Sequence, residues 1–169
     1  WRADNRRVPD AALIAHIHER LELARLVAPA DLLASLATYI EVLARWNARI
    51  NLTAYSLDRP TAEAIDRLIV EPVSMARFAG PDDRMTLDVG SGGGSPALPF
   101  RLAVPTLESH KLVETRQRKA AFLREAVRQL GVKGVTVDSR PTRAPFLAGL
   151  SSIRAASLTW ASRSARSSR

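Results

Sequence analysis

Residues 87–94 read Leu-Asp-Val-Gly-Ser-Gly-Gly-Gly, a short apolar run that breaks into a glycine-rich loop. Together with Met85, the apolar residues Leu87 and Val89 predict a buried strand that ends where the glycines begin. Glycines at positions 90, 92 and 94 let the backbone turn tightly and approach a ligand with no Cβ in the way. The stretch therefore predicts a ligand-binding turn at the end of a strand.

A second apolar run, Leu112-Val113, ends in an acid, Glu114, twenty residues beyond the loop. A glycine loop after one strand and a carboxylate at the tip of the next are typical of Rossmann-type sheets that bind nucleotide-like cofactors. In such sites the loop holds the polar centre of the cofactor, and the acid accepts hydrogen bonds from the ribose hydroxyls. We expect the loop and Glu114 to grip opposite ends of one adenosyl group.

The surrounding pattern predicts half of a doubly wound α/β sheet. Strand 84–89, helix 96–104, strand 110–114, helix 116–130 and strand 134–138 alternate in βαβαβ order, and Gly131 stands where a helix-ending glycine belongs. Right-handed crossovers place the second strand beside the first and the third outside the second. This Rossmann-like half-sheet is expected over residues 81–140, after a turn at Gly80-Pro81.

The first 80 residues predict a helical segment. One helix begins after Pro9-Asp10, a second begins near Pro29, and a third runs from Thr61 to Phe78 with a kink or early end at Pro72. Trp46 lies on the apolar stripe of the second helix, so we expect it in the core. Asn47 and Asn51 are expected to cap the junction between this segment and the sheet.

Composition narrows the class of protein. The chain has 169 residues, a net charge of +8 and no cysteine, which excludes disulfides and thiolate metal sites. No apolar run approaches the roughly 18–20 residues that span a bilayer, and we expect a cytoplasmic protein. Residues 141–169 hold five arginines and no acid, a composition typical of a flexible basic tail. The net positive charge favours a polyanionic partner, although the tail alone could account for much of that charge.

The loop by itself leaves the ligand open. It fits G-x-G-x-G from Gly90, whereas a dinucleotide fingerprint requires glycine at position 95, where this chain has serine. Starting from Gly92 gives a weaker dinucleotide match with Ala97, and the absence of a following Gly-Lys-Ser/Thr excludes a P-loop. An S-adenosylmethionine site, a nicotinamide dinucleotide site and a turn without ligand remain the alternatives.

A wider set of motifs resembles one family. Trp46-Asn47, Asn51-Leu52-Thr53, the run from Asp88 through the glycines, and Leu112-Val-Glu114 resemble the RsmG (GidB) family over roughly residues 30–140. The resemblance implies S-adenosylmethionine-dependent methylation of N7 of a guanine in bacterial 16S ribosomal RNA. It also implies a set of cofactor-contacting residues: Asp88, Gly90, Ser91, Gly92, Gly94, Ser95, Glu114, Pro141, Thr142 and Arg154.

The chain also departs from the family pattern. Thr142 replaces a glutamate that flanks the adenine in the family, and the sequence stops 15 residues after Arg154 in a Ser/Arg-rich run. We therefore expect a C-terminally truncated member in which the last part of the sheet is missing or degraded. A gene shifted out of frame near residues 140–155 would have this form, and reading the neighbouring nucleotides would test it.

The implied chemistry needs few special side chains. N7 of guanine has a free lone pair and no proton, so we expect no catalytic base, and the three histidines lack metal-ligand spacing with an acid. We expect no metal, a monomer, and 16S ribosomal RNA or the small ribosomal subunit as partner. The cations expected to contact phosphates are Arg116, Arg118, Lys119, Arg124, Arg128, Lys133, Arg140 and Arg143. A nicotinamide-dependent oxidoreductase and a non-catalytic RNA-binding remnant are the alternative functions.

Overall fold

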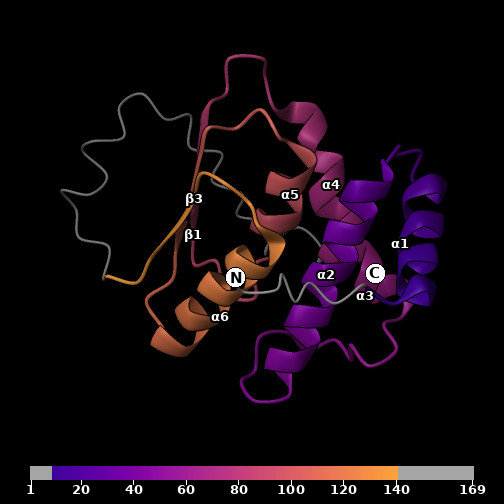
Figure 1. The fold of residues 1–169 in the computed structure, drawn as a ribbon, viewed down its shortest axis with the longest axis horizontal. Coiled ribbons are helices and arrows are strands. Elements are labelled where there is room, and N and C mark those ends of the chain that lie inside the picture. Colours follow the sequence, from indigo (N-terminus) through magenta and orange to yellow (C-terminus); the bar gives the residue numbers. More distant parts are fainter. Residues whose placement is uncertain (1–8, 141–169) are drawn as a thin grey trace, which may run out of the picture.

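The computed structural model describes residues 9–140, and the elements follow the expected order (Figure 1). The helical segment contains α1 (Ala11–Leu23) and α2 (Ala30–Asn47), followed by a continuous helical run of α3 (Ala62–Ile65), η1 (Asp66–Val70), α4 (Glu71–Ser74) and η2 (Met75–Phe78). The alternating part contains β1 (Met85–Val89), α5 (Ala97–Ala103), β2 (Ser109–Val113), α6 (Gln117–Leu130) and β3 (Val135–Asp138).

Local sequence signals account for several of these ends. The Asp10 side chain accepts a hydrogen bond from the Ala12 N–H and caps α1. Gly131 ends α6 in the left-handed conformation with φ +62°, as expected for a glycine after a helix. The third helical run reaches Phe78 as predicted, but its geometry changes to a π-helix over Asp66–Val70, directly before Pro72.

The three strands form a parallel sheet in the order β1-β2-β3, which confirms the predicted half of a Rossmann-like sheet. Met85 of β1 pairs with Ser109 of β2, and His110 of β2 pairs with Val135 of β3. Helices α5 and α6 connect successive strands and cover one face of this sheet, beside α2 and α4 (Figure 1). Because the strands are parallel, β1 and β2 bring the glycine loop and Glu114 to the same edge.

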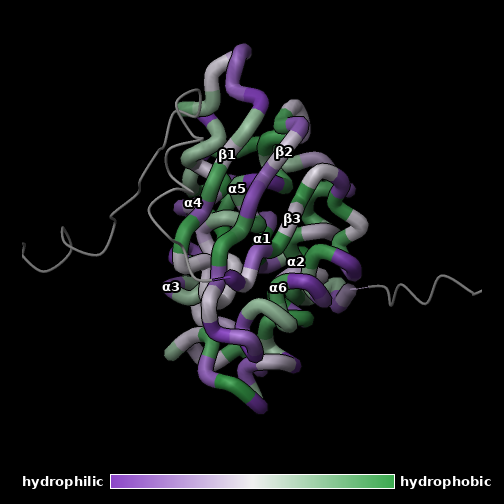
Figure 2. Tube along the Cα trace, turned by 90° about the vertical axis from the view of Figure 1, so that its left-hand side faces the viewer, coloured by the Kyte–Doolittle hydropathy of each residue, from purple (hydrophilic) through white to green (hydrophobic). Residues whose placement is uncertain are grey.

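The prediction that Met85, Leu87 and Val89 are buried is wrong. Met85 and Val89 are 51% and 58% exposed, and Leu87 is only partly buried. The helices pack on the opposite face, to which β2 contributes the fully buried Leu112. Figure 2 looks onto the face that carries β1, where the strands lie in front of the helices of the described chain. The apolar side chains of β1 do alternate, but they lie on the sheet face that no helix of residues 9–140 covers.

One hydrophobic cluster joins the helical segment to the sheet. It includes the fully buried Leu36 and Leu43 of α2, Leu98 of α5, Leu112 of β2 and Phe122 of α6. Trp46 packs edge-on against Phe122 with their ring centroids 6.0 Å apart, which confirms its core role. The glycine loop is thus held between elements that share a single core.

Several expectations fall outside the part of the chain that the structure describes. They concern Pro141, Thr142, Arg143 and Arg154 and the basic tail of residues 141–169. The proposed division at residues 80 and 140 stays a prediction. Among the helices of residues 9–140, none combines the length and apolarity that crossing a membrane requires.

Candidate functional site

The loop after β1 has the backbone that only glycine adopts readily. Gly90, Gly92 and Gly94 have φ angles of +84°, +50° and +81°. At Gly94 a Cβ would also lie 2.9 Å from Leu98 Cδ1 of α5 and 3.4 Å from Leu123 Cδ2 of α6. The glycine at position 94 is therefore required both by conformation and by the closeness of the two helices.

Most N–H groups of the loop are bonded within the protein. The Gly90 and Ser91 N–H groups both donate to the Val113 carbonyl at 2.8 and 3.2 Å. The Gly92 N–H donates to Glu114 Oε2 at 3.0 Å, and the Gly94 N–H donates to the Ser91 carbonyl at 2.6 Å. These four amides face β2 or the loop itself, so they are not arranged as a cradle for an anion.

Glu114 lies beside the loop, as predicted, and contacts it directly. Its Oε2 accepts from Gly92 and its Oε1 accepts from the Arg116 N–H at 2.8 Å, while the residue is only 6% exposed. Glu114 thus contacts Gly92 directly in this structure, and the expected grip of the loop and Glu114 on opposite ends of one adenosyl group stays a prediction. A carboxylate oxygen has two lone pairs, so each oxygen keeps one acceptor position that a ribose hydroxyl can use.

One peptide unit of the loop is different from its neighbours. Among residues 9–140, neither the Gly92 carbonyl nor the Gly93 N–H has a hydrogen-bond partner. The flanking units are both held, because the Gly92 N–H contacts Glu114 and the Gly93 carbonyl accepts from Tyr39. The Gly92–Gly93 peptide thus offers one donor and one acceptor next to Glu114.

Asp88 and Ser91 form the buried side of the loop. Burial raises the pKa of Asp88 above its ordinary value; the Ser91 hydroxyl opposes this, and the nearby Glu114 charge adds to it. Ser91 is 4% exposed, and its hydroxyl also donates to the Asp88 carbonyl at 3.2 Å. Asp88 is thus a carboxylate for which a positively charged neighbour would be favourable.

The helical segment contacts the loop at three points that the sequence did not reveal. The Tyr39 hydroxyl of α2 donates to the Gly93 carbonyl at 2.7 Å, and the Leu52 carbonyl lies 3.0 Å from where a Cβ on Gly93 would stand. The Ser95 hydroxyl donates to the Leu68 carbonyl at 3.2 Å. The Leu68 carbonyl is available to Ser95 because Pro72, four residues later, lacks the N–H that would normally bond to it in a helix.

Comparison with known proteins identifies the family. A sequence-family model described as GidB, rRNA small subunit methyltransferase G, matches residues 32–143. The chain belongs to this family. It is 38% identical over 115 residues to ribosomal RNA small subunit methyltransferase G of Stenotrophomonas maltophilia (strain K279a), which covers 68% of this chain and 51% of the relative.

Two further relatives carry the same name. The protein from Nitrosomonas europaea is 39% identical over 106 residues, covering 63% of this chain and 47% of the relative. The protein from Cupriavidus pinatubonensis is 33% identical over 141 residues, covering 79% of this chain and 60% of the relative. The chain therefore spans about half the length of the curated GidB relatives it matches.

The cations predicted to contact RNA in this GidB chain divide into two groups. Some have protein partners: Arg124 donates to Ser139 at 2.9 Å, Arg128 contacts Glu125 at 2.7 Å, and Arg140 contacts Asp138 at 2.9 Å. Arg116 and Arg118 are exposed at the start of α6, and no side-chain partner is found for them within residues 9–140. These two cations lie close in sequence to Glu114, at the loop edge of the sheet.

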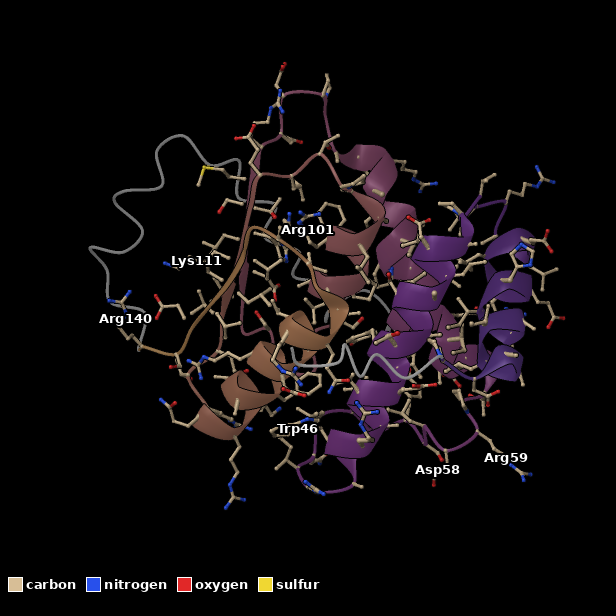
Figure 3. All side chains as sticks on the ribbon, in the orientation of Figure 1. Trp46, Asp58, Arg59, Arg101, Lys111 and Arg140 are labelled. Atoms are coloured by element: carbon tan, nitrogen blue, oxygen red, sulfur yellow. The ribbon has the colours of Figure 1, made fainter. Side chains whose placement is uncertain are left out.

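Two hollows lie away from the glycine loop. One of about 430 Å³ is lined by residues of β2, α6 and β3, including Lys111, Arg124 and Arg140. Figure 3 shows Lys111 and Arg140 on the side of the sheet away from the helices. The other, of about 550 Å³, lies between α1, α2 and the stretch around Asp58-Arg59. Neither of these two hollows is lined by the loop or by Glu114.

The histidines do not form a metal site in the part of the chain that is described. Residues 9–140 contain no group of three or more His, Asp or Glu placed to bind a metal ion. His18 is exposed and lies 3.6 Å from Glu22. His110 is 2% exposed, contacts the Thr86 hydroxyl through Nδ1, and has a pKa lowered to about 4, mainly by burial and further by the charge of Arg101.

Proposed function

We propose that the chain takes part in S-adenosylmethionine-dependent methylation of N7 of a guanine in 16S ribosomal RNA. Membership of the GidB family and the curated relatives named as ribosomal RNA methyltransferases support this proposal. Because the chain spans about half of those relatives, the activity and its RNA substrate are inferred for this chain. A ribosomal substrate would place the protein in the cytoplasm, and we propose that it acts as a monomer.

The observation that carries the cofactor choice is the direction of the loop amides. A dinucleotide site needs several free backbone N–H groups around the pyrophosphate, at a glycine turn and a helix N-terminus. Here the amides of Gly90, Ser91, Gly92 and Gly94 already donate within the protein. This supports a ligand without phosphates, such as S-adenosylmethionine, over a nicotinamide dinucleotide.

The residues present fit such a ligand. We propose that Glu114 accepts from the ribose hydroxyls and that the free Gly92–Gly93 peptide contacts the polar groups of the amino-acid part. Asp88 supplies negative charge near the ammonium and sulfonium groups. The other proposed contacts in the described chain are Gly90, Ser91, Gly94 and Ser95, and Pro141, Thr142 and Arg154 complete the proposed set outside it.

The reaction places few demands on the protein. The bound cofactor would supply an electrophilic methyl group, and guanine N7 attacks with a lone pair that carries no proton. The chain's own residues therefore need only bind, orient and exclude water, which is the part of catalysis that positioning provides.

Contact with RNA is proposed through the exposed cations of α6. Arg116 and Arg118 lie at the same end of the sheet as the loop, and Arg124 and Arg128 continue along the helix. Cations that neutralise phosphates release counterions from the nucleic acid, so this contact would weaken steeply with added salt.

Calorimetric titration tests the cofactor. We expect S-adenosylhomocysteine to bind in the micromolar range and NAD to bind far more weakly. Glu114→Ala should abolish the binding, whereas Glu108→Ala, which removes an exposed acid outside the site, should leave it unchanged. Tighter binding of NAD than of S-adenosylhomocysteine would contradict the proposal.

A non-catalytic RNA-binding module is the second candidate, supported by the exposed cations Arg116 and Arg118. Methyl transfer from labelled S-adenosylmethionine to undermethylated small ribosomal subunits separates the two. Incorporation at guanine N7 supports the enzyme, and RNA binding without incorporation supports the module.

A further inference from the structure

Tyr39 is an unusual residue on the buried face of α2. Its side chain is fully buried within the hydrophobic cluster, yet it carries a hydroxyl that must find a partner there. The partner is the Gly93 carbonyl, 2.7 Å away and 54 residues further along the chain. Burial also raises the pKa of Tyr39, so the hydroxyl keeps the proton that it donates.

This contact fixes a whole peptide plane. The Gly93 carbonyl and the Gly94 N–H belong to one planar unit and point in opposite directions. Tyr39 holds the carbonyl end, and the Ser91 carbonyl accepts from the Gly94 N–H at 2.6 Å. The plane is therefore held at both ends, once by the loop and once by α2.

A second plane in the loop is held in the same way. The Ser91 carbonyl accepts from Gly94, and the Gly92 N–H donates to Glu114 at 3.0 Å. Between the two held planes lies the Gly92–Gly93 peptide, which has no hydrogen-bond partner within residues 9–140. The orientation of this peptide is set by the two held planes on either side, because glycine residues do not restrict the backbone angles themselves.

The backbone before α3 also lies close to Gly93. The Leu52 carbonyl lies 3.0 Å from the position that a Cβ on Gly93 would take, so a side chain at position 93 would crowd this carbonyl. Leu52 is in turn fixed by Asn47, whose Oδ1 accepts from the Leu52 N–H at 2.8 Å. The Tyr39 hydroxyl that bonds Gly93 and the Leu52 carbonyl close to it thus both belong to the helical segment and not to the sheet.

We propose that Tyr39 is a positioning residue for the cofactor site: by holding the Gly93 carbonyl it aims the free Gly92–Gly93 peptide at the ligand. The inference rests on the proposed function, because the ligand is taken to be S-adenosylmethionine. It extends that function by assigning the helical segment a direct part in forming the cofactor site.

The experiment removes one oxygen atom. Tyr39→Phe keeps the ring in the core and deletes only the hydroxyl. We expect affinity for S-adenosylhomocysteine, measured by calorimetry, to fall about 5- to 10-fold, as the loss of one hydrogen bond predicts. Amide hydrogen exchange at Gly94 should quicken by a similar factor, since its peptide plane loses one of two anchors.

Two controls separate positioning from stability. Tyr55→Phe makes the same chemical change at the chain's other tyrosine, whose hydroxyl has no partner in the described chain. Ile17→Val trims a fully buried residue of α1 and lowers stability without touching the loop. Both variants should bind S-adenosylhomocysteine as the wild type does.

The outcomes are distinguishable. Weaker binding in Tyr39→Phe alone supports the inference. Equal binding by Tyr39→Phe and the wild type overturns it while leaving the proposed function intact, as does an equal loss in Ile17→Val. If the wild type itself fails to bind S-adenosylhomocysteine, the proposed function and the inference both fall.

Discussion

The side-chain oxygen of Asn47 accepts two backbone hydrogen bonds, from the Leu52 N–H at 2.8 Å and from the Thr53 N–H at 3.0 Å. Asn47 is the last residue of α2, so one side chain closes the turn that leads away from the helix. Asn47 therefore acts as a cap as predicted, but the turn lies inside the helical segment, before α3, and not at the junction of this segment with the sheet. The turn matters for the site because the Leu52 carbonyl faces Gly93.

Replacing Asn47 tests this turn. Asn47→Ala leaves two partly buried N–H groups without an acceptor and should lower the free energy of unfolding by about 1–3 kcal/mol. Asn47→Asp keeps the acceptor oxygens and should lose less than half as much. Urea unfolding monitored by circular dichroism measures both. Equal losses in the two variants would show that the oxygen is not what stabilises the turn.

Gly94 should be the least replaceable glycine of the loop. Gly94→Ala combines a φ of +81° with a Cβ 2.9 Å from Leu98 Cδ1, and we expect a loss of about 2–4 kcal/mol from strain and overpacking. Gly131→Ala is the matched control, because its φ is +62° but no atom lies within 4 Å of the new Cβ. It should lose about 1 kcal/mol. Thermal unfolding ranks the two, and a reversed order would contradict the crowding at Gly94.

Local signals explain why much of the fold could be predicted from the sequence. The caps at Asp10 and Gly131, the helical spacing in α2 and the alternation of strands and helices each act over a few residues. The position of Glu114 beside the loop also followed, because parallel strands bring their carboxyl ends to one edge. These features depend on neighbours in the chain or on the handedness of crossovers.

The features that were missed depend on contacts between distant residues. Tyr39 reads as one more member of an apolar stripe, and nothing near it signals a partner 54 residues away. The exposure of Met85 and Val89 likewise depends on which face α5 and α6 cover, which strand alternation cannot decide. The direct contact of Glu114 with the Gly92 N–H likewise depends on side-chain placement.

Because one face of β1 is exposed, substitutions on that face should change the stability of the protein little. Val89 is 58% exposed although it belongs to an apolar strand, so Val89→Thr should change the free energy of unfolding by less than about 0.5 kcal/mol. Leu112→Ala on the covered face of β2 should lose about 2–5 kcal/mol, because Leu112 is fully buried. Urea unfolding compares them. A large loss in Val89→Thr would mean that this face is covered in solution.

His110 predicts a specific pH dependence. Its folded pKa of about 4 lies below the ordinary value of 6.5, so the neutral form is favoured in the fold. The stability it contributes is fully present above about pH 6.5 and is lost as pH falls towards 4, by about 3 kcal/mol in total. Unfolding measured from pH 7 to 4 should show this slope.

The control for His110 is its non-titrating variant. His110→Leu should flatten the slope between pH 6.5 and 4, while titration of the carboxylates is common to both proteins. Glu125, whose pKa is lowered to about 2 chiefly by Arg128, loses its contribution only at lower pH. A slope that survives in His110→Leu would assign the transition to another group.

The proposed RNA surface predicts a measurable salt dependence. Arg116 and Arg118 are exposed, and if both contact phosphates, the Arg116→Ser/Arg118→Ser variant should reduce the slope of log K against log salt by about 1.4–1.8. Arg128 is already paired with Glu125 at 2.7 Å, so Arg128→Ser should reduce the slope by less than one. Titrations of a 16S ribosomal RNA fragment at several salt concentrations measure both slopes. If the double variant keeps the wild-type slope, phosphate contact at the start of α6 is ruled out, and the basic charge would have to act elsewhere on the chain.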